Sequence, residues 1–368
     1  MSDSEYRPAS RKELIQALMP FAESDTRQGL RQFVVDYAIF LVGLGLALFT
    51  ANLALRTLGA LLIGLKTSGL YTLSHDASHN SLTASRKLNK ALAVLGLMPT
   101  LMNQRLWAHD HVVMHHVKTN GPQTDIFRPM SLADYRAAPA WRRAWERLTR
   151  STSVLARAPV GMVASRWLVE KVVPNRAVHS EKVRREAWPI TALLACWVGG
   201  MLLFMAVRHN GEPVAVLLDV LFVFVLPICI FWVSLGNASY IQHTHPSIPW
   251  FEAGDKRMAD CSQEELTTHV QMPPVLASLI HNGLEHAAHH VLPAIPNYRL
   301  REAQARLNEL LKGAAIVMPL SLRGLREVAS TCKLYDYQNH RWLDFDGNPT
   351  TPSLVESAVY QAPARAVA

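Results

Sequence analysis

The chain has 368 residues, of which 49% are hydrophobic and only 18% are charged. It is long enough for one large domain or two ordinary ones, and it is too apolar for an intrinsically disordered protein. The net charge of +8 leaves a nucleic-acid or membrane-surface partner open, whereas four cysteines without a CxxC pair exclude a small disulfide-bonded scaffold.

Four apolar runs predict four membrane-spanning helices. They cover residues 33–55, 57–74, 187–207 and 213–237. Each run has about the 17–25 residues that cross a bilayer core of roughly 30 Å as a helix. Buried helices of a soluble protein are the alternative, but such helices rarely lack a polar face over five turns. We therefore predict an all-α fold, in which a four-helix transmembrane domain carries a cytosolic helical cap.

The basic residues predict the orientation in the membrane. The connections after the first and third runs each offer one arginine, Arg56 and Arg208, whereas residues 80–186 carry nearly half of all lysines and arginines. By the positive-inside rule, both termini and this middle segment lie in the cytosol, so in a bacterium the protein would be in the inner membrane. The basic excess then needs no nucleic-acid partner, and no nucleic-acid-binding motif accompanies it.

The chain is expected to divide into three parts. Residues 1–32 form a cytosolic N-terminal segment that is too polar and too acidic for a signal peptide. Residues 33–310 form the membrane domain with its cap. Residues 311–368 form a cytosolic C-terminal tail.

The histidines gather in four clusters that follow the apolar runs. Twelve of the sixteen histidines belong to them: His75 and His79; His109, His111, His115 and His116; His243 and His245; His281, His286, His289 and His290. Spacings of three and four residues place imidazoles on one face of a helix. A mononuclear zinc site takes about four ligands, and here about nine histidines are available. The count therefore favours two metal ions, and redox-active iron with open positions for O2 is the economical choice.

In this order, the motifs HxxxH, HxxxHH, QHTHP and HxxHH resemble those of the integral-membrane fatty-acid desaturase and hydroxylase superfamily. QHTHP, followed by HN and HxxHH, is especially similar to the acyl-lipid desaturase branch. The resemblance covers roughly residues 30–300. It implies a non-haem di-iron centre, and it implies O2-dependent attack on an unactivated C–H bond of a fatty-acyl chain, with electrons from a separate donor.

The resemblance also implies the metal ligands. They would be His75, His79, His111, His115, His116, His243, His286, His289 and His290. The commoner second motif has two residues before its HH pair, whereas three residues separate His111 from His115, so His109 is a rival of His111. For His245 and His281 we favour supporting or structural roles. Asp76, Asn237, Asp125 and Glu285 are candidates for orienting the ligand imidazoles, because a metal-bound histidine usually donates its other N–H to a carboxylate or carbonyl; simple surface or capping polarity is the alternative for each.

Several outcomes are open on such a scaffold. Desaturation of a fatty acid, acyl-lipid or acyl-carrier substrate is the preferred prediction. Hydroxylation, or decarboxylation of a free acid to a terminal 1-alkene, would use the same motifs. A membrane metal transporter is a remote alternative, because its ligands would lie near the bilayer midplane rather than at the ends of the apolar runs.

Lys66 is the candidate for binding the substrate head group, since an ionisable residue inside a membrane span is a functional candidate by default. The alternative is a lysine that snorkels to the membrane surface. The chain offers neither a haem-binding HPGG nor a ferredoxin-like cysteine cluster. The electron donor is therefore expected to be a separate ferredoxin or cytochrome that docks on the basic cap.

Overall fold

The structure is a computed structural model that describes residues 10–122, 126–164 and 167–356. Its first eight α-helices are α1 (Arg11–Leu18), α2 (Thr26–Phe49), α3 (Leu53–Ser78), α4 (Arg86–Leu97), α5 (Gln104–Ala108), α6 (Leu132–Ala137), α7 (Ala140–Thr149) and α8 (Arg157–Ala164). The others are α9 (Glu181–Arg208), α10 (Pro213–Val220), α11 (Leu226–His243), α12 (Arg257–Asp260), α13 (Pro274–Leu279), α14 (His286–Val291), α15 (Asn297–Leu311) and α16 (Leu322–Thr331).

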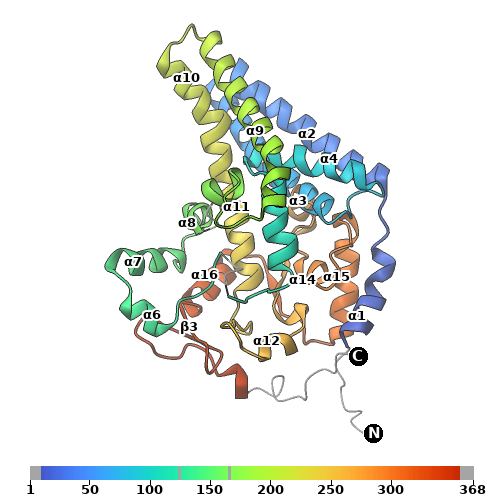
Figure 1. The fold of residues 1–368 in the computed structure, drawn as a ribbon, viewed down its shortest axis with the longest axis vertical. Coiled ribbons are helices and arrows are strands. Elements are labelled where there is room, and N and C mark those ends of the chain that lie inside the picture. The colour runs from blue at the N-terminus through green and yellow to red at the C-terminus, as the bar shows by residue number, and fades with distance from the viewer. Residues whose placement is uncertain (1–9, 123–125, 165–166, 357–368) are drawn as a thin grey trace.

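Shorter elements complete the fold. The π-helical turns are η3 (His109–His115), η4 (Trp167–Val172) and η5 (Leu221–Val225). The 3-10 turns are η1 (Met19–Phe21), η2 (Met98–Thr100), η6 (Gln263–Glu265) and η7 (Leu354–Glu356). The strands are β1 (His269–Gln271), β2 (Val317–Pro319), β3 (Leu334–Asp336) and β4 (Arg341–Leu343). In Figure 1 the long helices α2, α3, α9 and α10–α11 lie above a cap of short elements.

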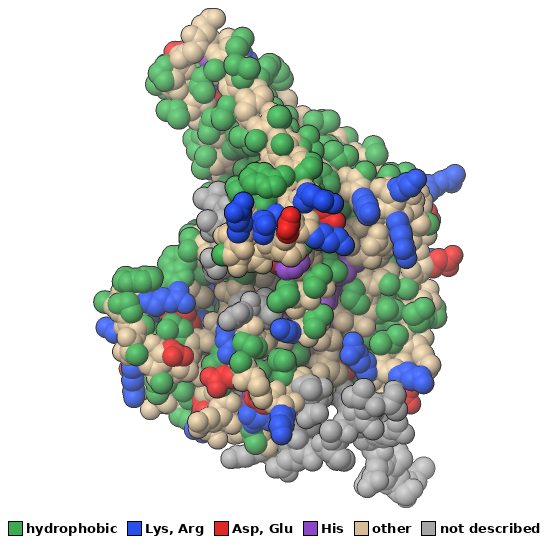
Figure 2. Space-filling view, in the orientation of Figure 1, with side chains coloured by type: hydrophobic (Ala, Val, Ile, Leu, Met, Phe, Trp, Pro, Cys, Tyr) green, Lys and Arg blue, Asp and Glu red, His purple; other side chains and the backbone are tan. Residues whose placement is uncertain are grey.

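Within the described part of the chain, four helices are long and apolar enough to cross a membrane, which confirms the predicted all-α, four-span architecture. They are Thr26–Phe49, Leu53–Ser78, Glu181–Arg208 and Pro213–His243, the last made of α10, η5 and α11. In α9 only 11% of the apolar window is buried inside the protein, so this helix presents most of its surface to lipid. Figure 2 shows the apolar side chains that cover this upper part of the molecule.

The first connection between spans differs from the prediction. It lies at residues 50–52 rather than at Arg56, because the Asn52 side chain caps α3 by accepting hydrogen bonds from the backbone N–H groups of Ala54 and Leu55. Arg56 is therefore inside α3, where its guanidinium lies 2.7 Å from Asp219 of α10. The prediction placed the connection at the charged Arg56 because the capping residue Asn52 carries no charge and so did not mark a boundary in the apolar pattern.

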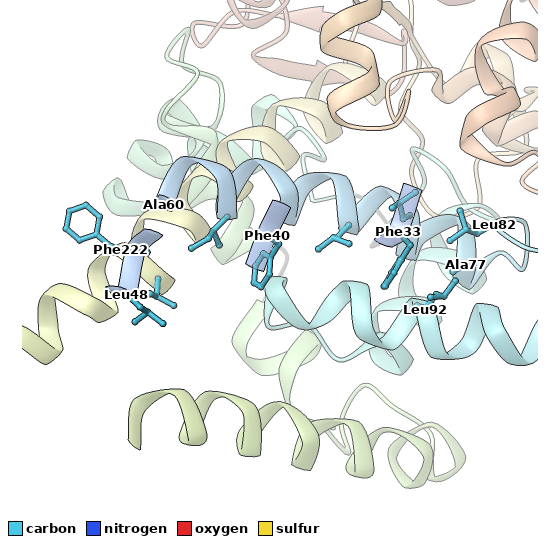
Figure 3. Packing of buried hydrophobic residues seen from close by; sticks show 14 of the residues in the cluster. Phe33, Phe40, Leu48, Ala60, Ala77, Leu82, Leu92 and Phe222 are labelled. Atoms are coloured by element: carbon cyan, nitrogen blue, oxygen red, sulfur yellow. The ribbon is translucent and has the colours of Figure 1, made fainter. Parts of the chain in front are cut away.

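The membrane helices α2 and α3 pack closely along their length. Gly43 and Gly59 face each other, and a Cβ on Gly59 would lie 2.6 Å from the Gly43 carbonyl oxygen, so small residues permit this approach. Around the contact lies a core shared with α4 and η5, in which Figure 3 shows Phe33, Phe40 and Phe222. This packing fixes the end of α3 that reaches the cap.

The expected C-terminal tail is part of the cap. Strand β2 pairs in parallel with β1, and Tyr335 and Trp342 are fully buried with Tyr240 of α11 in one apolar cluster. Buried residues between 318 and 342 therefore pack against the cap end of α11 and stabilise it. The hydropathy pattern that marks membrane spans could not predict this packing, because the contacts join segments far apart in the chain.

Candidate metal centre

Nine histidines converge in two neighbouring groups of ring nitrogens. Group A contains His75, His79, His111, His116 and His289, and group B contains His115, His243, His286 and His290. Each residue offers one nitrogen, and within each group these atoms lie within 4.8 Å of one another. The nine residues are those that the resemblance implies as ligands.

The two groups are interleaved along the chain. His115 belongs to group B and its neighbour His116 to group A, while His289 belongs to group A and its neighbour His290 to group B. The second and fourth histidine motifs, HxxxHH and HxxHH, therefore each contribute to both groups. The fourth span contributes His243, its last residue, to group B. This interleaving ties the cap and the ends of α3 and α11 into one centre.

The irregular spacing of the second motif is accommodated by the π-helical turn η3. In a π-helix the repeat is one residue longer than in an α-helix, and the backbone N–H of His116 accordingly bonds to the carbonyl of His111. The ring nitrogens Nε2 of these two residues lie 3.2 Å apart. His111 therefore joins group A in spite of the extra residue. Its rival His109 points elsewhere, toward Asp110 and His179.

The donor set fits metal ions. The Nε2 atoms of His243 and His286 lie 3.0 Å apart, and those of His286 and His290 lie 2.9 Å apart. Two nitrogens bound to one ion at about 2.1 Å are separated by about 3 Å when they are adjacent in the coordination shell. The buried Nε2 of His79 and Nδ1 of His289 have no hydrogen-bond partner, which is unfavourable for a polar atom unless another group binds it.

The imidazoles are held in their neutral form. Burial, followed by the proximity of other histidines, places the pKa of His111, His286, His289 and His290 well below the usual value. Neutral imidazole is the form that binds metals. The arrangement is therefore suited to a cation rather than to an anion.

Several side chains and one carbonyl orient the histidines. Asp76 Oδ1 lies 3.0 Å from Nδ1 of His75, and its other oxygen accepts the backbone N–H of Asn297. The Nδ1 atom of His243 lies 3.1 Å from the carbonyl oxygen of Leu266. Such partners fix the ring orientation of a ligand.

Gln263 is a functional candidate that the sequence analysis missed. Its Oε1 atom lies 2.9 Å from Nδ1 of His290 and also accepts a hydrogen bond from Thr119. The residue begins the 3-10 turn η6, which is distant from every histidine motif in the sequence. No spacing or composition signal could have identified it.

The comparison with known proteins decides the family. The family profile described as "Fatty acid desaturase" matches residues 51–320, which include all nine histidines. The chain belongs to the fatty acid desaturase family.

Several curated relatives that are similar to this chain are named as desaturases. The chain is 27% identical to "Omega-6 fatty acid desaturase, chloroplastic" of Spinacia oleracea, over 74% of this chain and 58% of that protein. It is 23% identical to the "sn-1 oleoyl-lipid 12-desaturase" of a Picosynechococcus strain, over 77% and 78%. With the "Fatty acid desaturase" of Bacillus subtilis it shares 25% identity over 91% and 90%. The chain spans about 60% of the length of the chloroplast relatives that it matches.

Three other predicted site residues have partners outside the two groups. The backbone N–H of Ser247 donates to His245 Nδ1, and burial lowers the pKa of His245 to about 4. Asn237 donates from its amide to the carbonyls of Val154 and Val233. These contacts make His245 and Asn237 structural. Glu285 lies 2.7 Å from His269, and Asp125 lies outside the described residues.

Lys66 and His281 meet at a single carboxylate in the membrane domain. Lys66 Nζ lies 2.6 Å from Oδ1 of Asp36, and His281 Nε2 lies 2.8 Å from Oδ2. The structure therefore differs from both hypotheses for Lys66, because its ammonium is buried in an ion pair instead of meeting a head group or the membrane surface. The apolar pattern of the second run could not show that Asp36 of α2 lies opposite Lys66 of α3.

A cavity of about 210 Å³ adjoins both histidine groups of this desaturase-family chain. The lining combines six of the nine histidines and polar groups such as Asp110, Lys171 and Glu285 with large apolar and aromatic side chains, among them Tyr71, Trp107, Phe231, Trp232, Leu235 and Leu284. Trp107 stacks on His111 and donates from its indole to Tyr71 Oη. Phe231 precedes His243 by twelve residues, or about 18 Å of helix. The cavity therefore extends from the histidines between α3 and α11 toward the membrane interior.

Among the described residues that line the cavity, Lys171 is the only lysine, so its side chain brings an ammonium group to the cavity wall. It forms an ion pair with Asp110, which precedes His111. Burial lowers the pKa of Lys171 to about 8. A polar end of the cavity thus lies beside the second histidine motif.

Proposed function

We propose that this chain is an integral-membrane di-iron enzyme that uses O2 to introduce a double bond into a fatty-acyl chain. The observation that carries the proposal is the position of the two groups of histidine nitrogens, which meet at the head of an apolar cavity between membrane helices. The names of the curated relatives support a fatty-acyl substrate.

The histidines of groups A and B would each hold one iron ion. Bound iron supplies the oxidising power needed to remove hydrogen from an unactivated C–H bond with O2. Asp76, Gln263 and the Leu266 carbonyl keep the imidazole nitrogens directed inward. The nine histidine side chains are neutral donors, so they would bind the metal ions without offsetting their positive charge, and no carboxylate ligand would be needed.

The cavity would bind the acyl chain. Its aromatic and aliphatic lining replaces water around the chain, which favours binding roughly in proportion to the apolar area buried. Phe231 is fully buried at the membrane end of the cavity. Its ring contacts the ring of Tyr71, with 5.5 Å between the two centroids. We propose that this pair limits how far the chain can enter.

We also propose that the cap and both termini face the cytosol. Several exposed basic residues, Arg86, Lys87, Lys90, Lys182 and Arg185, lie at the cap ends of α4 and α9. Figure 2 shows Lys and Arg side chains gathered where the apolar helices meet the cap, with histidine visible just below them. This basic surface suits an acidic ferredoxin or cytochrome as electron donor.

Metal analysis of the purified protein tests the proposed centre. We expect about two irons per chain, together with O2 consumption and an unsaturated product when a donor and an acyl substrate are supplied. Exchangeable zinc in place of iron, or protein without bound metal after iron-replete expression, would contradict the proposal.

A further inference from the structure

Three ionisable side chains form a buried cluster between the membrane spans and the fourth histidine motif, HxxHH. Asp36 of α2 receives Lys66 of α3 on one oxygen and His281 on the other, at 2.6 and 2.8 Å. The exposed fractions are 2% for Asp36 and 7% for both Lys66 and His281. Burying charges in a membrane domain is costly, and such residues commonly pair with one another and have a function.

The loop that follows α13 places His281 against the spans. Gly69 of α3 makes room for the contact, because a Cβ there would lie 2.2 Å from Asp36 Oδ2 and 3.2 Å from the Leu279 carbonyl oxygen. His281 and the next residue, Asn282, both have left-handed backbones, with φ of 50° and 55°. Residues other than glycine adopt this conformation at a cost, so surrounding contacts must hold it.

The same loop leads directly to the metal-binding histidines. His281 precedes His286 by five residues. Between them, Asn282 donates to the Asn297 carbonyl, Gln242 of α11 donates to the Gly283 carbonyl, and Glu285 lies 2.7 Å from His269. The contact of His281 with Asp36 adds an attachment of this loop to the membrane helix α2.

We propose that Asp36, Lys66 and His281 are positioning residues that fix the fourth histidine motif, HxxHH, relative to α3 and thereby strengthen metal binding. Lys66 pairs with the carboxylate and holds it in place, and the carboxylate holds His281. The other loop contacts remain when His281 is replaced, so the expected result is weaker metal binding rather than unfolding. This inference rests on the proposed metal centre.

A second cluster of the same kind provides a matched control. Asp219 of α10 is 1% exposed and receives Arg56 at 2.7 Å and His209 at 2.9 Å. Arg56 precedes His75 by nineteen residues, or about 28 Å of helix. Arg208 also lies 3.5 Å from the Asp219 carboxylate. The control cluster therefore combines one buried aspartate with a histidine and basic side chains at the other end of the membrane domain.

The test compares His281→Asn with His209→Asn in full-length protein freed of metal. Asparagine tolerates a left-handed backbone, so the substitution at 281 removes mainly the contact with Asp36. Each variant is titrated with Co²⁺, its absorption is recorded, and its thermal stability is measured. We expect His281→Asn to weaken Co²⁺ binding by on the order of tenfold, and His209→Asn to leave it unchanged even where the stability falls equally.

A second variant covers the case in which a single change prevents folding. Asp36→Asn combined with Lys66→Met removes both charges and leaves an amide oxygen that can accept from His281, so Co²⁺ affinity should stay close to that of the wild type. Three results would overturn the inference. They are an equal Co²⁺ affinity in all variants, an equal loss of Co²⁺ affinity in His281→Asn and His209→Asn, and a loss of Co²⁺ binding in the double variant without the two charges. Weaker Co²⁺ binding in His281→Asn alone would support it even if the wild type showed neither iron nor desaturation.

Discussion

The Nε2 atoms of His111 and His116 lie 3.2 Å apart, one π-helical turn from each other. In an α-helix, residues five apart point in different directions, whereas the wider π-helical turn brings them into line. The second histidine motif therefore reaches both groups, with His116 in group A and His115 in group B.

The first prediction separates His111 from its rival. His111→Ala should lower the iron content and abolish turnover, because it removes a nitrogen from group A. His109→Ala should leave the iron content unchanged, since His109 contacts Asp110 and His179 instead. Iron per chain, measured on both purified variants, checks the assignment. The reverse result would show that the π-helical register is wrong.

The second prediction concerns the extra residue itself. Val113 lies in η3 with 52% of its side chain exposed, so its deletion removes little packing. The deletion restores two residues between His111 and the HH pair, and we expect the segment to become α-helical while the protein keeps most of its iron. Inserting an alanine after Val113 should abolish iron binding. Metal analysis distinguishes the two, and loss of iron in both would contradict a compensating π-turn.

The third prediction tests the membrane end of the cavity. Phe231→Leu should shift the preferred substrate toward longer acyl chains, because the smaller side chain frees space beyond Tyr71. Phe222→Leu is the control, since Phe222 is equally a core residue but packs in the α2–α3 cluster. Competition between acyl chains of different length, followed by mass spectrometry, measures the shift. The same shift in both variants would indicate a general loss of packing.

The fourth prediction concerns the electron donor. Turnover with an acidic ferredoxin or cytochrome should slow as salt is raised, because screening weakens steering by the basic surface. Lys182→Glu with Arg185→Glu should lower the rate at low donor concentration, whereas Arg306→Glu on α15 should not. Rates measured against donor concentration at two ionic strengths decide this, and salt-independent turnover would exclude docking by charge.

The sequence predicted the spans and the histidine set because both depend on local spacing. His75 with His79, and His286 with His290, are one helical turn apart wherever the helix is placed. The pairing of Lys66 with Asp36 could not be predicted, since it depends on how α2 and α3 rotate against each other. Gln263 and the buried residues beyond 310 were missed for the same reason. Their contacts join segments that are distant in the chain, whereas residue spacing and hydropathy predict only local structure.

The most direct test of the proposed activity is mass spectrometry of the fatty acids in cells that express the wild type, compared with cells that express His286→Ala. His286 lies at the centre of group B, with its Nε2 atom 3.0 Å from His243 and 2.9 Å from His290. We predict acyl chains with an additional double bond in wild-type cells alone. Identical fatty-acid profiles in the two strains, at equal protein levels, would contradict the account.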